Sequence, residues 1–399
     1  MNDAETLDRS DPLRSFRDRF LLPDGVIYLD GNSLGPVPRE TPDRVAAVVR
    51  HEWGQSLIRA WNDHGWIDLA RRVGDKIGRL IGADPGTTIV TDSTSINIFK
   101  CLGAALTLRP ERGVILSETG TFPTDLYIAQ GMTRPGCSLR TIDDPVMGLD
   151  ENVAVLMLTH VNYRTGAMHD MAAITAAAHK AGALVLWDLS HSVGAVPLAL
   201  AKDGADFAVG CGYKYLNGGP GAPAFLSVSP RHWNDLRFPL TGWLGHADPF
   251  AFDPNYRPAS GVAGAVVGTP PILSLAALEV GVDLMLEAPL DLVRAKSTAL
   301  TERFLSLMQA RGFRSITPAD PARRGSQISF SHREGYAVMQ ALIARGVIGD
   351  FRTPDVMRFG FAPLYLRYRD VDDAVAIVDD IMRTEAWRDP AFQQRQVAT

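Results

Sequence analysis

The sequence predicts an α/β fold in which a mainly parallel sheet is flanked by helices and followed by a smaller α+β C-terminal domain. Two observations predict it. From about residue 88, short runs that are apolar throughout alternate with helical segments, as expected of strands covered on both faces. Beyond about residue 270, the pattern changes to a long helical stretch, two short strands and a closing helix. The chain has 399 residues, 46% of them hydrophobic, which is enough for both cores.

Three parts follow from this change in pattern. Residues 1–50 are predicted to form an N-terminal arm that packs with the small domain. Residues 51–268 would form the large domain, and residues 269–399 the small C-terminal domain. Within residues 245–261 lies a long polar loop, a kind of segment that is often functional in a compact enzyme.

Two helices are predicted before the sheet begins, over residues 41–53 and 67–84. The second is the clearer, because apolar side chains recur in it at steps of three and four and so share one face. Gly82 supplies its C-terminal stop. The shared face consists of Leu69, Val73, Ile77, Leu80 and Ile81.

The sheet itself is predicted from five apolar runs, at residues 113–118, 153–161, 183–191, 206–212 and 222–229. The clearest unit is strand, helix and strand over residues 153–188, which is typical of a right-handed βαβ crossover. The small domain is predicted from the helical stretch, two strands and closing helix at residues 271–312, 328–332, 356–363 and 370–387.

Composition excludes several classes of function. A net charge of −5 without a long basic run argues against a nucleic-acid partner and favours a soluble protein. No apolar run is long enough to span a membrane, and the charged first 20 residues contain no signal core. Cys101, Cys137 and Cys211 are isolated, which predicts reduced thiols and a cytoplasmic location. The nine histidines lack metal-ligand spacing, so no metal site is expected.

Polar side chains stand where three of the predicted strands end. Thr159 lies near the end of one strand, Asp188 closes the next with His191 three residues on, and Tyr213 and Lys214 follow a third. Asp188 and Lys214 are about one βαβ repeat apart, so adjacent strands could bring both to the same edge of the sheet. A lysine facing a carboxylate at a sheet edge suits pyridoxal phosphate, which needs an amine for its Schiff base and an acid for its pyridine nitrogen.

The cofactor would also need an anion site for its phosphate and an aromatic side chain that stacks on its ring. Ser93, Thr94 and Ser95 precede a helical run, where hydroxyls and free N–H groups bind anions. Phe122 could stack on the ring, with Asp125 nearby.

Each of these residues also has an ordinary structural interpretation. Lys214 could be a surface lysine, Asp188 a helix cap and the serine–threonine run a simple N-cap. His191 could be a packed histidine and Thr159 a strand-end hydroxyl. The residues alone therefore leave two interpretations open, a pyridoxal phosphate enzyme and a protein in which these groups are structural. What favours the enzyme is that all the groups occur in the expected order.

At this level of detail the sequence resembles the kynureninase family, and the similarity extends from about residue 25 to 385. The block at 213–221 together with GWLGH is the most specific part. Related desulfurases and other class V aminotransferase-like enzymes share the aspartate, histidine and lysine but lack these two blocks. The matching motifs, in order, are GNSLG (31–35), FPTD (122–125), DLSHSVGAVPL (188–198), YKYLNGGPG (213–221), GWLGH (242–246), TPPIL (269–273) and RFGFAPLY (358–365).

The resemblance implies a fold like that of aspartate aminotransferase, with a mainly parallel seven-stranded sheet. It also implies a homodimer with active sites at the interface. The implied reaction is hydrolysis of L-kynurenine to anthranilate and L-alanine in tryptophan catabolism, with 3-hydroxy-L-kynurenine left open as a second substrate.

The resemblance also implies roles for individual residues. Lys214, Tyr213 and Asp188 would be catalytic: the Schiff-base lysine, the proton donor that also reaches the phosphate, and the partner of the pyridine nitrogen. The remaining cofactor contacts would come from Thr94, Ser95, Phe122, Asp125, Thr159 and His191, and from Trp243 and Thr269 of the neighbouring subunit. Arg358 would bind the substrate α-carboxylate as a fork, with Ser33 and His64 near the substrate.

Two alternatives accompany this interpretation. The first is a desulfurase or lyase acting on another amino acid, but a desulfurase needs a mobile, exposed cysteine and none is evident. The second is a cofactor-free homologue, against which the joint presence of Lys214, Asp188 and Arg358 argues.

Overall fold

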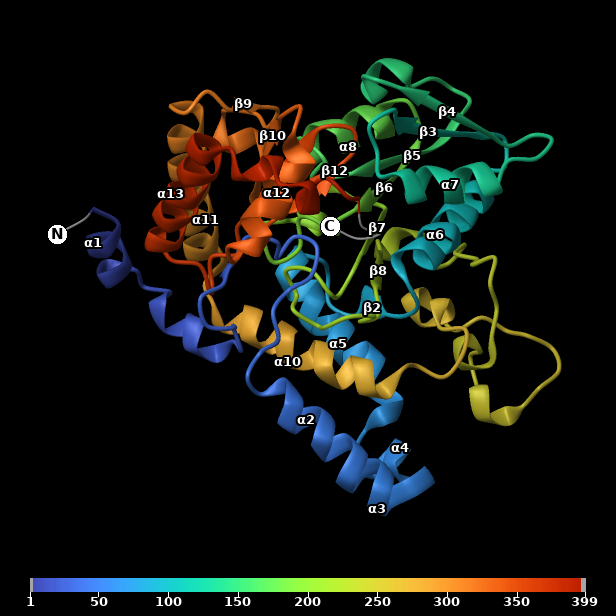
Figure 1. The fold of residues 1–399 in the computed structure, drawn as a ribbon. Helices are drawn as coiled ribbons and strands as arrows, with labels where there is room; N and C mark the ends of the chain where they lie inside the picture. The colour runs from blue at the N-terminus through green and yellow to red at the C-terminus, as the bar shows by residue number, and fades with distance from the viewer. Residues whose placement is uncertain (1–2, 396–399) are drawn as a thin grey trace.

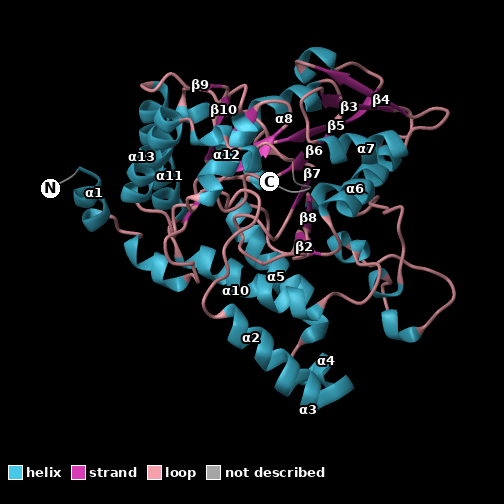
Figure 2. Cartoon of the chain, in the orientation of Figure 1, coloured by secondary structure: helices cyan, strands magenta, loops and turns pink. Residues whose placement is uncertain are grey.

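The computed structural model describes residues 3–395. Its largest element is a seven-stranded sheet that runs through the middle of the molecule with helices around it (Figure 2). The strand order is β2-β8-β7-β6-β5-β3-β4, and β8 alone runs in the opposite direction to the other strands. The predicted mainly parallel α/β sheet is confirmed. Its strands are β2 (Thr88–Val90), β3 (Val114–Glu118), β4 (Ser138–Ile142), β5 (Val153–Thr159), β6 (Leu184–Asp188), β7 (Phe207–Gly210) and β8 (Phe225–Val228).

Burial explains which strands the sequence reveals. Every residue of β5, β6, β7 and β8 is buried, which is why these strands read as continuous apolar runs. Two strands of this sheet were not predicted. β4 lies at the edge of the sheet and is polar and partly exposed, and β2 has only three residues. Neither carries the continuous apolarity that identifies a central strand.

The helices predicted before residue 290 are present with shorter bounds, whereas the short helices at residues 54–56, 60–63, 123–131 and 200–203 were not predicted. Gly82 ends α5 in the left-handed conformation, at φ 63°, as its position in the sequence indicated. The helix predicted over residues 41–53 is regular only in its first half, because Val48–Trp53 adopts the wider π-helical turn. The helices are α2 (Thr41–Ala47), α3 (Gly54–Ser56), α4 (Ala60–Asp63), α5 (Trp66–Ile81), α6 (Thr94–Leu108), α7 (Pro123–Gly131), α8 (Met171–Lys180), α9 (Leu200–Asp203) and α10 (Ile272–Glu287).

The C-terminal part is an antiparallel sheet with three helices, in the order β12-β13-β10-β9. The long helical stretch predicted over residues 271–312 is two helices, because Pro289 interrupts it after α10. Glu279 of α10 pairs with Arg72 of α5 at 2.8 Å, so α10 packs beside the large sheet. The division into domains at residue 269 stays a prediction. The elements are α11 (Leu290–Gln309), β9 (Arg314–Ser315), β10 (Gln327–Ser331), α12 (Gly335–Ala344), β12 (Asp350–Arg352), β13 (Val356–Gly360) and α13 (Tyr368–Thr384).

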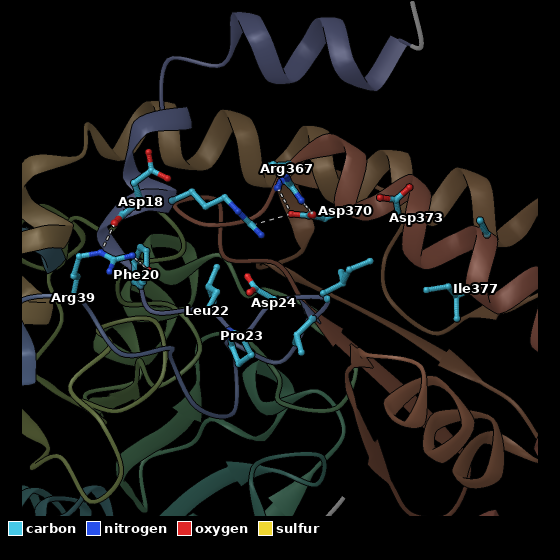
Figure 3. Close-up of a pocket in the computed structure, with 15 residues that line it drawn as sticks. Asp18, Phe20, Leu22, Pro23, Asp24, Arg39, Arg367, Asp370, Asp373 and Ile377 are labelled. Carbon is cyan, nitrogen blue, oxygen red and sulfur yellow. Dashed lines mark hydrogen bonds and ion pairs between the residues drawn. The ribbon is translucent and has the colours of Figure 1, made fainter.

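The N-terminal segment lies against this C-terminal part (Figure 1). It begins with α1 (Asp3–Ser10), and β1 (Ile27–Tyr28) pairs in parallel with β11 (Val347–Ile348). Arg17 binds Asp370 of α13 at 3.1 Å. A groove of about 750 Å³ lies between this segment and α13, with polar and charged side chains along both walls (Figure 3).

No helix among residues 3–395 has both the length and the apolar composition needed to cross a membrane.

Candidate active site

A cavity of about 240 Å³ lies at the carboxyl edge of the large sheet. Thr159 is the last residue of β5 and Asp188 the last of β6, and the two face each other in the register of these strands. Lys214 follows the end of β7 by four residues. Parallel strands in register bring their carboxyl ends together, which is why the three groups meet. Of the predicted residues, the cavity is lined by Thr94, Ser95, Phe122, Asp125, Thr159, Asp188, His191, Tyr213 and Lys214.

The amine of Lys214 is held by a neutral histidine. Its Nζ lies 2.9 Å from Nε2 of His191, which is buried beneath it. Burial and the charge of Lys214 hold the pKa of His191 well below its ordinary value. An uncharged imidazole can accept a hydrogen bond from the amine, and it fixes where the amine points.

Two buried carboxylates face the same cavity. Oδ1 of Asp188 accepts hydrogen bonds from the backbone N–H of Ser190 at 2.9 Å and from its hydroxyl at 2.6 Å, which fix the carboxylate plane. Burial raises the pKa of Asp188, and burial together with the charge of Asp188 raises the pKa of Asp125 well above its ordinary value. A cation placed between them would be strongly favoured.

The opposite wall is the N-terminus of α6. Ser93 caps this helix, accepting a hydrogen bond from the N–H of Ile96 at 3.4 Å. Thr94 and Ser95 begin the helix, so their hydroxyls and free N–H groups stand at its positive end. This wall can hold a phosphate.

Tyr213 lines the cavity beside Lys214, whose Nζ is 5.8 Å from the phenol ring centroid. The adjacent sulfur of Cys211 and partial burial raise the pKa of the Tyr213 phenol. The phenol therefore stays protonated at neutral pH and can donate a proton.

The cavity residues fit pyridoxal phosphate. Three of their buried polar atoms have no hydrogen-bond partner among the described residues: Oδ2 of Asp125, Oγ1 of Thr159 and Nδ1 of His191. Buried polar atoms are rarely left unpaired, so these three atoms suit contact with a polar ligand. A ring with a protonated nitrogen and polar substituents would satisfy them, next to an amine and an anion site.

Arg358 lies in a buried ionic cluster on β13. Its Nε donates to Asp350 at 2.8 Å, and its Nη2 binds both the second oxygen of Asp350 and the hydroxyl of Ser33, the latter at 2.8 Å. Its Nη1 donates to the carbonyl oxygen of Tyr163 at 2.7 Å. Asp350 thus occupies the fork that the resemblance implies for the substrate carboxylate. One N–H of Nη1 is left by these bonds, since a guanidinium has five donors.

Two members of this cluster, Asp350 and Tyr163, were not predicted from the sequence. Asp350 pairs with Arg358 in the register of β12 and β13, and also binds Arg352 at 2.7 Å. Strand β12 has three residues, too few to show a period. Tyr163 contacts Phe122 edge to face, at 5.1 Å between centroids. It contributes to the cluster through its backbone, which composition does not reveal.

Five predicted residues do not line this cavity. Ser33 and Arg358 lie in the ionic cluster described above, and the other three lie elsewhere. Trp243 and Thr269 are exposed on the segment between β8 and α10. His64 is exposed after α4 and lies 2.9 Å from the hydroxyl of Ser56. The roles of all three stay predictions.

The chain has relatives of known name. It is 51% identical to the kynureninase of Pseudomonas fluorescens and 52% identical to that of Burkholderia pseudomallei (strain 1106a). Each comparison covers 100% of this chain and 99% of the relative. The chain belongs to the kynureninase family. A family model described as the kynureninase C-terminal domain matches residues 293–378. Membership confirms the predicted resemblance, and with it a pyridoxal-phosphate-dependent hydrolase.

Solved structures support the fold of this kynureninase family member. A cysteine desulfurase from Thermococcus onnurineus superposes with a TM-score of 0.78 at 17% identity, covering 96% of this chain and 99% of that one. A mutant of the lyase C-DES, with glycine linked to its PLP cofactor, superposes with a TM-score of 0.81 at 18% identity. It covers 91% of this chain and 99% of that one. The predicted fold class is confirmed.

The desulfurase alternative has no chemical support in this chain. Cys101, Cys137 and Cys211 are all buried and unpaired, whereas a desulfurase needs an exposed, mobile thiol. The structural likeness to desulfurases is one of fold.

Proposed function

We propose that the protein hydrolyses the Cβ–Cγ bond of L-kynurenine, releasing anthranilate and L-alanine, with pyridoxal phosphate held on Lys214. One observation carries the proposal. In a chain half identical to kynureninases, the amine of Lys214, the carboxylate of Asp188 and the N-terminus of α6 line one cavity. The bound cofactor supplies an electron sink for the bonds at Cα of the substrate.

Lys214 and Asp188 would act in the steps that remove the proton from the substrate Cα. Asp188, held by Ser190, would pair with the pyridine nitrogen and keep it protonated. The Lys214 amine, once free, would remove the proton from the substrate Cα, and His191 would keep that amine in place.

Tyr213 would act in the later step that protonates Cβ. After water has attacked the γ-carbonyl of the substrate and anthranilate has left, Cβ needs a proton. Tyr213 would supply this proton, and its position in the cavity beside Lys214 supports the assignment.

The α-carboxylate of the substrate would bind at the ionic cluster. Arg358 and Ser33 are already hydrogen-bonded to each other, so they would act as one unit, with Asp350 holding the guanidinium in a fixed plane. His64 would lie near the substrate only if another part of the assembly brought it there.

We propose a homodimer in which Trp243 and Thr269 approach the partner's phosphate. Support comes from an exposed aromatic cluster on their segment. Trp243 is 42% exposed, Phe250 60% and Phe252 74%, and the Trp243 and Phe252 rings stack at 6.3 Å. Exposed aromatic groups of this size are typical of protein interfaces. We also propose a cytoplasmic location, supported by the three unpaired cysteines.

The test is cofactor uptake and turnover. The purified protein should show the visible absorbance of bound pyridoxal phosphate and release fluorescent anthranilate from L-kynurenine. Lys214→Ala should lose the covalent absorbance band and turnover, while Lys202→Ala, at an exposed lysine on α9, should keep both. A wild-type protein that takes up no cofactor would refute the proposal. Turnover on 3-hydroxy-L-kynurenine, measured alongside, decides between the two substrates.

A further inference from the structure

Lys100 is a fully buried lysine outside the catalytic cavity. It lies in α6 with 0% exposure, two turns after the cap that Ser93 forms. A lysine is almost never fully buried unless its charge is paired. Its Nζ binds Oδ2 of Asp92 and donates to the carbonyl oxygen of Ala265 at 2.6 Å. These two partners belong to segments of the chain that are far apart in sequence.

Asp92 belongs to the turn that forms the phosphate wall. It precedes Ser93 and adopts φ +48°, a conformation that a residue with a side chain rarely adopts. Such backbone persists only where its surroundings fix it. Its Oδ2 also accepts from the hydroxyl of Thr91 at 2.7 Å, and its carbonyl accepts from the N–H of Ala224, which lines the cavity. Lys100 and Thr91 thus fix the carboxylate of this turn.

Ala265 belongs to the segment that carries Trp243. It ends the 3-10 helix Gly261–Ala265, and the next two residues pack directly under GWLGH. A Cβ on Gly242 would lie 1.8 Å from the carbonyl oxygen of Val267, and one on Gly245 would lie 2.7 Å from that of Val266. Because Val266 and Val267 follow Ala265 and pack closely against Gly242 and Gly245, a shift of Ala265 would also displace Trp243.

We propose that Lys100 is a positioning residue that joins the phosphate wall of its own subunit to the segment that reaches the partner subunit. Binding of the cofactor phosphate and association of two chains would then be linked, because both need the same turn and segment held in place. The inference rests on the proposed phosphate site and dimer.

The chain offers a matched control in Lys296. This second buried lysine also binds one carboxylate, Asp11 at 2.6 Å, and one backbone carbonyl, that of Pro363 at 2.6 Å. It lies on α11, outside the catalytic cavity. Lys296→Met therefore removes the same interactions without touching the proposed link.

The experiment titrates apoprotein with pyridoxal phosphate and measures self-association by sedimentation velocity with and without cofactor. Lys100→Met should weaken cofactor affinity about tenfold or more and make the dimer dissociation constant independent of cofactor. Lys296→Met should lower the unfolding temperature but keep the wild-type affinity and linkage. Wild-type affinity in Lys100→Met, or equal losses in both variants, would overturn the inference. If the wild type itself binds no cofactor, the proposed function fails instead.

The variant Asp92→Asn tests whether Lys100 acts by holding the turn in place or only through its positive charge. If Lys100 acted only by adding positive charge near the phosphate, removing the nearby negative charge should strengthen cofactor binding. If Lys100 acts by holding the turn, Asp92→Asn should weaken binding, because the ionic link is lost. Weaker binding is the result expected, and tighter binding would contradict the proposal.

Discussion

Gly35 should be required for turnover because of what lies against it. The residue is in the GNSLG segment, and its N–H donates to the carbonyl oxygen of Tyr213 at 2.8 Å. A Cβ there would lie 2.3 Å from the carbonyl oxygen of Lys214 and 2.9 Å from Cα of Asn217. Its φ is not in the positive region, so the close approach is the reason for glycine.

The size of the effect can be worked from these distances. Cβ atoms essentially never come within 3.0 Å of such a neighbour, so Gly35→Ala must separate the two segments by at least about 0.7 Å, from 2.3 to 3.0 Å. This moves Lys214 relative to Ser33. A misplacement near 1 Å can cost about 100-fold in rate, so we expect kcat to fall about 10- to 100-fold. Overpacking should cost about 1–3 kcal/mol of the free energy of unfolding.

The assay is anthranilate release from L-kynurenine, with cofactor absorbance and thermal unfolding measured on the same samples. Gly131→Ala is the control, because a Cβ at this last residue of α7 meets nothing within 4 Å. It should leave kcat unchanged. Wild-type kcat and stability in Gly35→Ala, or an equal loss in both variants, would refute the reasoning.

Three further outcomes are expected. Tyr213→Phe should slow anthranilate and alanine formation by about 100-fold or more while the cofactor absorbance persists, and unchanged alanine release would contradict the role as proton donor. Arg358→Lys keeps the charge but loses both the paired hydrogen bonds to Asp350 that orient the side chain and the remaining Nη1 donor, so KM should rise about tenfold or more with cofactor affinity unchanged; an unchanged KM would exclude this residue from substrate binding. Asp206 accepts from His179 at 2.8 Å and from Arg231, and these bonds hold its pKa below the ordinary value despite its burial. Its stabilisation is therefore present above about pH 4 and lost as the pH falls toward the lowered pKa. Urea unfolding should show a decline in the free energy of unfolding below pH 4 that Asp206→Asn reduces, and identical pH profiles would contradict this.

Most of the fold could be predicted from the periodicity of apolar residues, but strands that are partly exposed or very short could not. α5 was predicted from apolar residues at steps of three and four, and the buried strands from continuous apolar runs. β4 lacks such a run because it is a partly exposed edge strand, and β2 is only three residues long. The helical stretch expected over residues 271–312 is divided into α10 and α11 at Pro289, because proline interrupts a helix.

The sequence by itself predicted which side chains meet at the carboxyl edge of the large sheet. Thr159, Asp188 and Lys214 each follow a strand whose buried, apolar character is local, and parallel pairing in register then forces their ends to one edge. No long-range information was needed beyond the handedness of the crossovers.

Only the tertiary structure decided the contacts that join distant segments. Asp350 meets Arg358 because β12 and β13 pair in one register, and Lys100 meets Ala265 across 165 residues of chain. The register and docking of such segments come from packing across the whole molecule, and no local pattern in the sequence encodes them.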